Sequence, residues 1–132
     1  MRTESAYWAT IYIGRLDFIS EKECLLKSLA AVCRYFCDKT GICVSFTETT
    51  YVYWGGKESG IIVGLINYPR FPNPPEILKN QALELAKRLK VVAKQEWITV
   101  VFPNEIISLN DEDDKETFFN IPGETDNDRE SS

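Results

Sequence analysis

The sequence predicts an α+β domain in which two helices pack on one face of a four-stranded antiparallel sheet. Two long segments place apolar residues at helical spacing, and four shorter ones are rich in β-branched and aromatic residues. These segments follow the order strand, helix, strand, strand, helix, strand. The chain has 132 residues, of which 44% are hydrophobic, so one domain of this size buries a core without disulfides.

The first strand is predicted at residues 7–14, where both faces are apolar and both are therefore expected to be covered. A capping box follows, in which the Ser20 hydroxyl accepts the backbone N–H of Glu23 and the Glu23 carboxylate returns to the Ser20 amide. A helix is expected from there to about Lys39, with Gly41 ending it. Its apolar stripe comprises Leu25, Leu29, Val32 and Phe36.

A β-hairpin is predicted next, from two runs of strand-forming residues at 43–54 and 61–68. The glycine-rich stretch Gly55–Gly60 separates them and is expected to form the turn. Four prolines between Pro69 and Pro75 exclude regular structure in the connection that follows.

The second helix is expected to begin with Asn73 as N-cap and Pro74 as the first helical residue. Its apolar stripe comprises Leu78, Ala82, Leu85, Leu89 and Val92. Residues 97–102 are predicted to form the last strand, which Pro103 stops or confines to a sheet edge. Residues 105–109 are expected to add a short strand or a docked arm.

The single domain is expected to span residues 1–110, and residues 111–132 are expected to form an acidic, disordered tail. The tail holds nine acids and two bases, a net charge of −7, which leaves +2 for the domain. Neither part has the basic excess of a nucleic-acid-binding protein. No apolar run is long enough to span a membrane and no export signal opens the chain, so a cytoplasmic location is expected.

The order of elements is that of the ferredoxin-like βαββαβ fold, with the strands expected in the spatial order last, first, third, second. The aromatic arm ending Trp54-Gly55-Gly56, the following Lys57–Gly60 and the approach to the last strand at Lys94–Trp97 resemble PII-like and related small ferredoxin-fold proteins, including short virus-encoded ones. The resemblance covers residues 7–109. It implies dimers or trimers that bind nucleotides or other small anions between subunits.

Helices on one face of the sheet leave the other face open. Side chains expected to contribute to that open face come from Trp8, Thr10, Tyr12, Tyr51, Tyr53, Ile98 and Phe102. So large an apolar surface favours burial against another copy of the chain in a closed homo-oligomer. The alternative is that residues 105–109 and the Phe118-Phe119 segment fold back over it.

Several kinds of chemistry are excluded. The chain has no histidine, which removes Ser-His-Asp and Cys-His catalysis and the usual general base near neutral pH. Its four cysteines lack the C-x-x-C spacing of zinc sites, so packing in the core is their interpretation and no metal is predicted. Gly55–Gly60 lacks the spacing of a phosphate-binding loop. The sequence therefore favours a non-catalytic protein without a cofactor.

The predicted ligand site is an anion site. The helix start at Ser20 offers free amides, and Arg15 and Lys57 are expected at the same sheet edge. Arg70, beside Tyr68 in the proline-rich loop, is a second candidate because a guanidinium among aromatic rings suits nucleobases and phosphates. Trp54, at the end of the aromatic arm, completes the predicted set. The structural alternatives are turn geometry and solvated surface charge.

Three functions are compatible with these observations. The first is a non-catalytic oligomeric module that binds a small anionic, nucleotide-like ligand for sensing or sequestration. The second is a small dimeric α+β-barrel enzyme with an aromatic pocket between two facing sheets, with Glu48 as the carboxylate. The third is a protein–protein interaction module or inhibitor that uses the open sheet face or the acidic tail.

Overall fold

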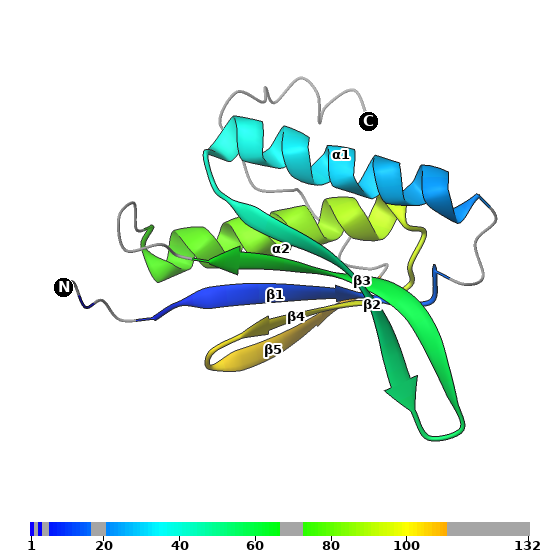
Figure 1. Cartoon of the computed structure of the whole chain (residues 1–132). Helices are drawn as coiled ribbons and strands as arrows, with labels where there is room; N and C mark the ends of the chain where they lie inside the picture. Colours follow the sequence, from blue (N-terminus) through cyan, green and yellow to red (C-terminus); the bar gives the residue numbers. More distant parts are fainter. Residues whose placement is uncertain (2, 4–5, 17–20, 67–72, 111–132) are drawn as a thin grey trace.

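The computed structural model describes residues 1, 3, 6–16, 21–66 and 73–110. Two helices lie on one side of a sheet and leave its other side open (Figure 1). The elements, in chain order, are β1 (Trp8–Ile13), α1 (Lys22–Thr40), β2 (Val44–Tyr53), β3 (Gly56–Ile66), α2 (Pro75–Val92), β4 (Ile98–Phe102) and β5 (Glu105–Leu109).

The sheet has five strands in the order β2-β3-β1-β4-β5, and all neighbouring strands are antiparallel. The predicted order of the first four strands is confirmed, but the predicted strand count is wrong. Pro103 does end β4, and the chain then turns back over two residues and pairs from Phe102↔Glu105 to Ile98↔Leu109. Ile107 and Leu109 are less exposed than Ile106 and Ser108, which alternate with them. This alternation is that of a strand with one face toward the core.

Both helices begin one residue later than the sequence predicts. Glu21, and not Ser20, is the N-cap of α1, and it makes no side-chain capping hydrogen bond; Ser20 lies outside the described residues. Pro74 is the N-cap of α2, with ψ at 145°, because the proline that follows it disfavours helical geometry. Gly41 ends α1 as predicted, with φ at 78° and its N–H donating to the Cys37 carbonyl.

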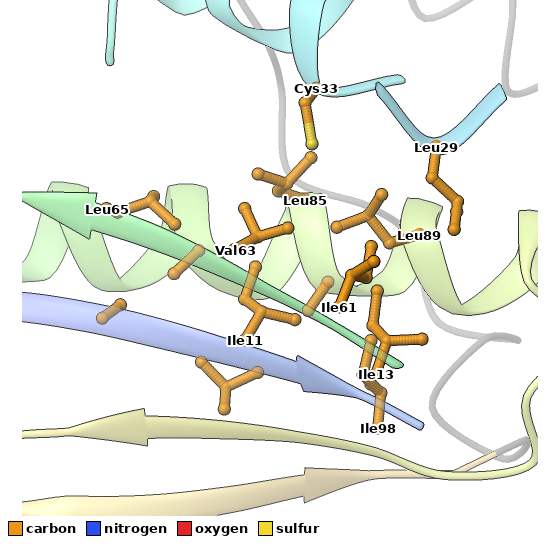
Figure 2. Packing of buried hydrophobic residues seen from close by; sticks show 14 of the residues in the cluster. Ile11, Ile13, Leu29, Cys33, Ile61, Val63, Leu65, Leu85, Leu89 and Ile98 are labelled. Atoms are coloured by element: carbon orange, nitrogen blue, oxygen red, sulfur yellow. The ribbon is translucent and has the colours of Figure 1, made fainter. Parts of the chain in front are cut away.

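The core lies between the helices and the sheet (Figure 2). Alternate residues of β1, such as Ile11 and Ile13, point toward the helices and are fully buried. The helices contribute Leu26, Leu29, Cys33 and Phe36 from α1, and Leu78, Ala82, Leu85 and Leu89 from α2. Ile98 and Phe102 also belong to this core, so neither contributes to the open face. We call the covered side of the sheet the helix face and the open side the outer face.

The hairpin turn differs from the prediction. Trp54 and Gly55 form a two-residue turn, and the pairing of β2 with β3 runs without a break from Tyr53↔Gly56 to Val44↔Leu65. Gly55 has φ at 86°, a conformation that glycine adopts without steric cost. The expected turn residues 57–60 are therefore part of a strand. Because β1 pairs with β3 only along Ile61–Ile66, the rest of the hairpin projects beyond the sheet and bends away from the helices (Figure 1).

Candidate functional site

A shallow pocket of about 250 Å³ opens where β1 ends, between the base of the projecting hairpin and the chain that leads into β4. We call it the hairpin-base pocket. Its lining combines a carboxylate, a guanidinium, a carboxamide and three aromatic rings. The lining residues are Tyr12, Gly14, Arg15, Tyr51, Glu58, Gln95, Trp97, Ile98 and Thr99.

Tyr51 joins the hairpin to the end of β1. Its hydroxyl lies 3.1 Å from the backbone carbonyl oxygen of Ile13 and 3.1 Å from that of Ile61, so its single proton is shared between the end of β1 and the middle of β3. The ring crosses Gly60, where an added Cβ would collide with the Ile13 carbonyl oxygen and with Cε2 of Tyr51. Only glycine at position 60 therefore lets the ring and the end of β1 approach so closely.

Glu58 supplies the carboxylate of the pocket. It lies directly opposite Tyr51 in the hairpin register, so both side chains project from the same face of the ribbon. Its Oε1 lies 2.9 Å from the position that a Cβ on Gly14 would occupy. The carboxylate thus rests over the bare backbone at the end of β1, and Gly14 provides the space for it.

Aromatic rings form the wall of the pocket on the sheet side. The rings of Tyr12 and Tyr51 lie 6.5 Å apart, centroid to centroid, at an interplanar angle of 53°. Trp97 also lines the pocket and is 59% exposed. An exposed indole beside two phenol rings is a surface that binds a flat apolar group or an organic cation.

Two residues with left-handed backbone conformations lie near the pocket. Arg15 has φ at 60° and directly follows the end of β1; Lys94 has φ at 54° and precedes the pocket residues Gln95 and Trp97. Non-glycine residues rarely adopt this conformation. Arg15 is itself one of the lining residues.

The Tyr51 hydroxyl stays protonated well above neutral pH. Burial raises its pKa to about 12, and the neighbouring Tyr12 and Glu58 act in the same direction. A phenol with this pKa acts as a hydrogen-bond donor near neutral pH and not as a base. In this pocket, Glu58 is thus the side chain suited to accept a proton or to hold a positive charge.

Of the three predicted ligand residues that the structure describes, one lies in this pocket. Arg15 lines the hairpin-base pocket. Lys57 and Trp54 are exposed on the projecting hairpin and are not lining residues. Ser20, Tyr68 and Arg70 lie outside the described residues, so their part in a site stays a prediction. Glu48, the carboxylate suspected in the barrel-enzyme hypothesis, is exposed on β2 opposite Ile61.

The sequence interpretation missed Tyr51 and Glu58 as a pair because it misplaced the hairpin turn. A turn at Trp54 and Gly55 fixes the register and sets Tyr51 opposite Glu58, whereas a longer loop over Gly55–Gly60 leaves Glu58 unpaired in the turn. The two-residue turn ending in Gly55 was the available indication. Gln95 and Trp97 were noted only as the approach to the last strand.

Other features of the described residues offer less chemistry. A groove of about 520 Å³ between α1 and α2 is mostly apolar. Cys33 is buried, which raises its pKa to about 12 and agrees with the predicted packing role, whereas Cys24 and Cys43 are exposed and do not pack in the core. Among the described residues, no cluster of side chains is suited to hold a metal ion. No helix in that part of the chain has the length and apolar character needed to cross a membrane.

Comparison with known proteins gives a match in structure but not in sequence. No protein-family model matches the chain, and no curated protein matches it either. Two solved structures of phage SAM lyase share its fold. One, in the apo state, has a TM-score of 0.61 and 20% identity over 85% of this chain and 95% of that chain. The other, in complex with S-methyl-5′-thioadenosine, has a TM-score of 0.56 and 16% identity over 81% and 91%.

This comparison contradicts the predicted non-catalytic module. Both of these structures are of an enzyme, and one of them holds a small nucleoside ligand. The expected α+β class is confirmed, and both matching structures are of phage proteins. The resemblance to PII-like proteins stays a prediction.

Proposed function

We propose that this chain is a lyase that cleaves S-adenosylmethionine and releases S-methyl-5′-thioadenosine. One observation carries the proposal: the hairpin-base pocket sets the Glu58 carboxylate beside the rings of Tyr51, Tyr12 and Trp97, in a fold shared with phage SAM lyase. A sulfonium ion is a cation with an apolar surround, and aromatic faces with a nearby carboxylate are suited to bind it.

The polar groups of the pocket match the remaining charges of this substrate. Its amino-acid part carries a carboxylate, which suits the Arg15 guanidinium, and an ammonium group, which suits Glu58. The exposed Trp97 indole offers a stacking surface for the adenine base. Arg15 would therefore still bind an anionic group, as the sequence predicted. That group would be the carboxylate of a substrate that also carries positive charges.

The bond change needs no metal ligand and no histidine. When the bond between sulfur and the γ-carbon breaks, both electrons stay on sulfur, and the thioether leaves as a neutral molecule. The γ-carbon, which loses the electron pair, gains a new bond in one of two ways. Either the β-proton leaves and its electron pair forms a double bond between the β- and γ-carbons, or the carboxylate of the four-carbon fragment bonds to the γ-carbon and closes a ring. Glu58 accepts the proton in the first route; in the second it holds the ammonium group while Arg15 aligns the attacking carboxylate.

The test is to incubate the purified protein with S-adenosylmethionine and follow S-methyl-5′-thioadenosine by liquid chromatography. Glu58→Gln should lower kcat/KM on the order of 10²-fold or more, because it removes the pocket carboxylate. Glu48→Gln is the matched control, since Glu48 is a carboxylate on the same hairpin that is exposed outside the pocket. It should leave turnover unchanged.

Two results would overturn the proposal. One is that the unaltered protein leaves S-adenosylmethionine intact at neutral pH. The other is that Glu58→Gln and Glu48→Gln retain the same turnover, which would place the chemistry elsewhere. Identification of the four-carbon product by mass spectrometry separates the elimination route from ring closure.

We also propose that the outer face is covered by a second copy of the chain. Trp8, Tyr12, Ile66 and Ile106 are exposed apolar side chains at outward positions of β1, β3 and β5. An exposed apolar surface of this kind is typical of subunit contacts. Native mass spectrometry should give a multiple of the 15.1 kDa protomer; a mass of one protomer at micromolar concentration would reject the proposal.

A further inference from the structure

The end of α2 holds one residue of the hairpin-base pocket, Gln95, in a fixed place. The helix closes with a Schellman motif, in which the Gln95 N–H donates to the Lys90 carbonyl oxygen at 3.0 Å. Within the same motif the Lys94 N–H donates to the Val91 carbonyl oxygen at 3.2 Å. Lys94 takes the left-handed conformation that the motif requires, with φ at 54°. The backbone of Gln95 is therefore anchored to the helix where this residue joins the pocket lining.

The carboxamide of Gln95 has a defined orientation. Its Nε2 lies 3.3 Å from the backbone carbonyl oxygen of Ala93, which is fully buried. A carbonyl oxygen only accepts hydrogen bonds, so the amide nitrogen and not the amide oxygen must face it. The acceptor Oε1 and the second N–H of Nε2 are then available to a ligand, as an acceptor and a donor side by side.

This carboxamide belongs to the part of the pocket that offers a stacking surface. Gln95 and Trp97 both line the pocket, whereas Glu96, between them, is exposed and is not a lining residue. A flat base that stacks on the Trp97 indole would present its edge to polar groups beside the ring.

We propose that Gln95 recognises the 6-amino group of a purine and makes the pocket selective for adenine nucleosides over their 6-oxo counterparts. This inference rests on the proposed function, in which the base stacks on Trp97. Adenine presents an N–H donor at its 6-amino group beside the acceptor N7, and a glutamine carboxamide pairs with both. A 6-oxo purine places an oxygen opposite Oε1, so that two acceptors meet and neither is satisfied.

The bond to Ala93 makes this recognition selective. A carboxamide that rotated freely would turn its nitrogen toward a 6-oxo group and accept either base. After such a rotation, Oε1 of Gln95 would face the Ala93 carbonyl oxygen, and the hydrogen bond between them would be lost. The end of α2 therefore favours the orientation that pairs with adenine.

The other polar lining residues are less suited to distinguish these bases. Glu58 and Arg15 are charged and are assigned to the amino-acid part of the substrate. Thr99 also lines the pocket, but a hydroxyl rotates and both donates and accepts, so it pairs with an amino group or with an oxygen. Gln95 is therefore the residue to which the selectivity is assigned.

The test measures binding to the full-length chain by isothermal titration calorimetry. The two probes are S-methyl-5′-thioadenosine and its 6-oxo counterpart, S-methyl-5′-thioinosine. We expect the unaltered protein to bind the adenosine probe about tenfold more tightly. Gln95→Leu should remove this preference by weakening the adenosine probe alone. The matched control is Gln81→Leu, the same change on α2 outside the pocket lining, which should keep the preference.

A second readout does not need the variant to fold. In the unaltered ¹⁵N-labelled protein, the side-chain amide signals of Gln95 should shift with the adenosine probe and much less with the inosine probe. Equal affinities or equal shifts for the two probes would overturn the inference, as would a preference that survives in Gln95→Leu.

These outcomes are distinct from failure of the proposed reaction, which is measured as release of S-methyl-5′-thioadenosine from S-adenosylmethionine. A protein that releases this product but does not distinguish the two probes would overturn the role of Gln95 alone. A protein that prefers the adenosine probe through Gln95 but leaves S-adenosylmethionine intact would overturn the lyase activity and support the adenine site. Binding of neither probe at millimolar concentration would overturn both.

Discussion

Alternate residues of the same strands form the two faces of the sheet, and the two faces differ in burial and in residue type. On β1, Ile11 and Ile13 point to the helix face and are fully buried, whereas Trp8 and Tyr12 point to the outer face and are more than a third exposed. The helix face holds almost only aliphatic side chains, and the outer face holds the rings and the carboxylate of the hairpin-base pocket. One alternation thus specifies both the fold and the site.

The same contrast appears in two glycines that meet at the end of β1, Gly14 directly after that strand and Gly60 on the neighbouring β3. An added Cβ at Gly60 would meet the backbone of β1 and the ring of Tyr51, neither of which can easily move. At Gly14 the nearest atom is the carboxylate oxygen of Glu58, at 2.9 Å, on a side chain that can rotate. The absence of a side chain at Gly60 therefore allows β1 and the Tyr51 ring to lie close to β3. The absence of a side chain at Gly14 leaves room for the Glu58 carboxylate.

The largest expected effect lies on the helix face. Phe36→Ala removes a fully buried ring and should lower the free energy of unfolding by about 3–5 kcal/mol. Ile106→Ala, on the outer face of β5 and 68% exposed in one protomer, should change the free energy of unfolding of the isolated protomer by less than about 0.5 kcal/mol, and any loss beyond this reports the proposed subunit contact. Urea unfolding monitored by circular dichroism measures both. A similar loss from the two variants would mean that the outer face is packed as tightly as the core.

Alanine substitutions at Gly60 and Gly14 should affect stability and activity differently. We expect Gly60→Ala to lower the free energy of unfolding by about 1–3 kcal/mol, because the β1 backbone must shift. Gly14→Ala should cost less than about 1 kcal/mol, since a flexible carboxylate can rotate away, but it should reduce turnover by moving Glu58. Denaturant titrations and turnover assays on the same preparations would check this; full activity in Gly14→Ala would show that the position of Glu58 is unimportant.

A smaller effect is expected at alkaline pH, and it involves one residue from each side of the sheet. Burial raises the pKa of Cys33 from 9.0 to about 12 and that of Tyr51 from 10.0 to about 12. The unfolded chain releases these protons at lower pH than the folded chain, so stability is full below pH 9 and falls as the pH rises from about 9 toward 12.

The Cys33 part can be isolated by substitution. In Cys33→Val the decline should be shallower but still begin near pH 9, because burial also raises the pKa of Cys37 from 9.0. Urea unfolding measured at several pH values between 8 and 11 gives the comparison. An equally steep loss of stability with pH in the variant and the unaltered protein would show that the Cys33 thiol does not contribute.

Buried residues could be predicted from the sequence where apolar side chains recur at helical spacing. The stripes of α1 and α2 predicted Leu29, Phe36, Leu85 and Leu89, and the structure buries all four. The strand order of the first four strands followed from the order of elements and from right-handed crossovers. Strand β5 was left open between a strand and an arm, because a five-residue segment after a proline carries little periodic information.

The site was harder to predict because it depends on register. Shifting the hairpin turn by a few residues changes which side chains face each other, and the pairing of Tyr51 with Glu58 exists only for the turn at Trp54 and Gly55. Arg15 could be found because charge at the end of a strand is visible in the sequence. The rings and the carboxylate beside Arg15 could not be predicted, because their position depends on the register of the hairpin.

The most direct test of the proposed site is to titrate S-methyl-5′-thioadenosine into ¹⁵N-labelled protein and follow the amide and indole signals. The account predicts saturable shifts at Gly14, Glu58 and the Trp97 indole N–H, which belong to the hairpin-base pocket. It also predicts that these shifts are weakened in Glu58→Gln or Gly14→Ala. Shifts confined to the groove between α1 and α2, around Tyr35 and Val91, or no shifts at millimolar ligand, would contradict it.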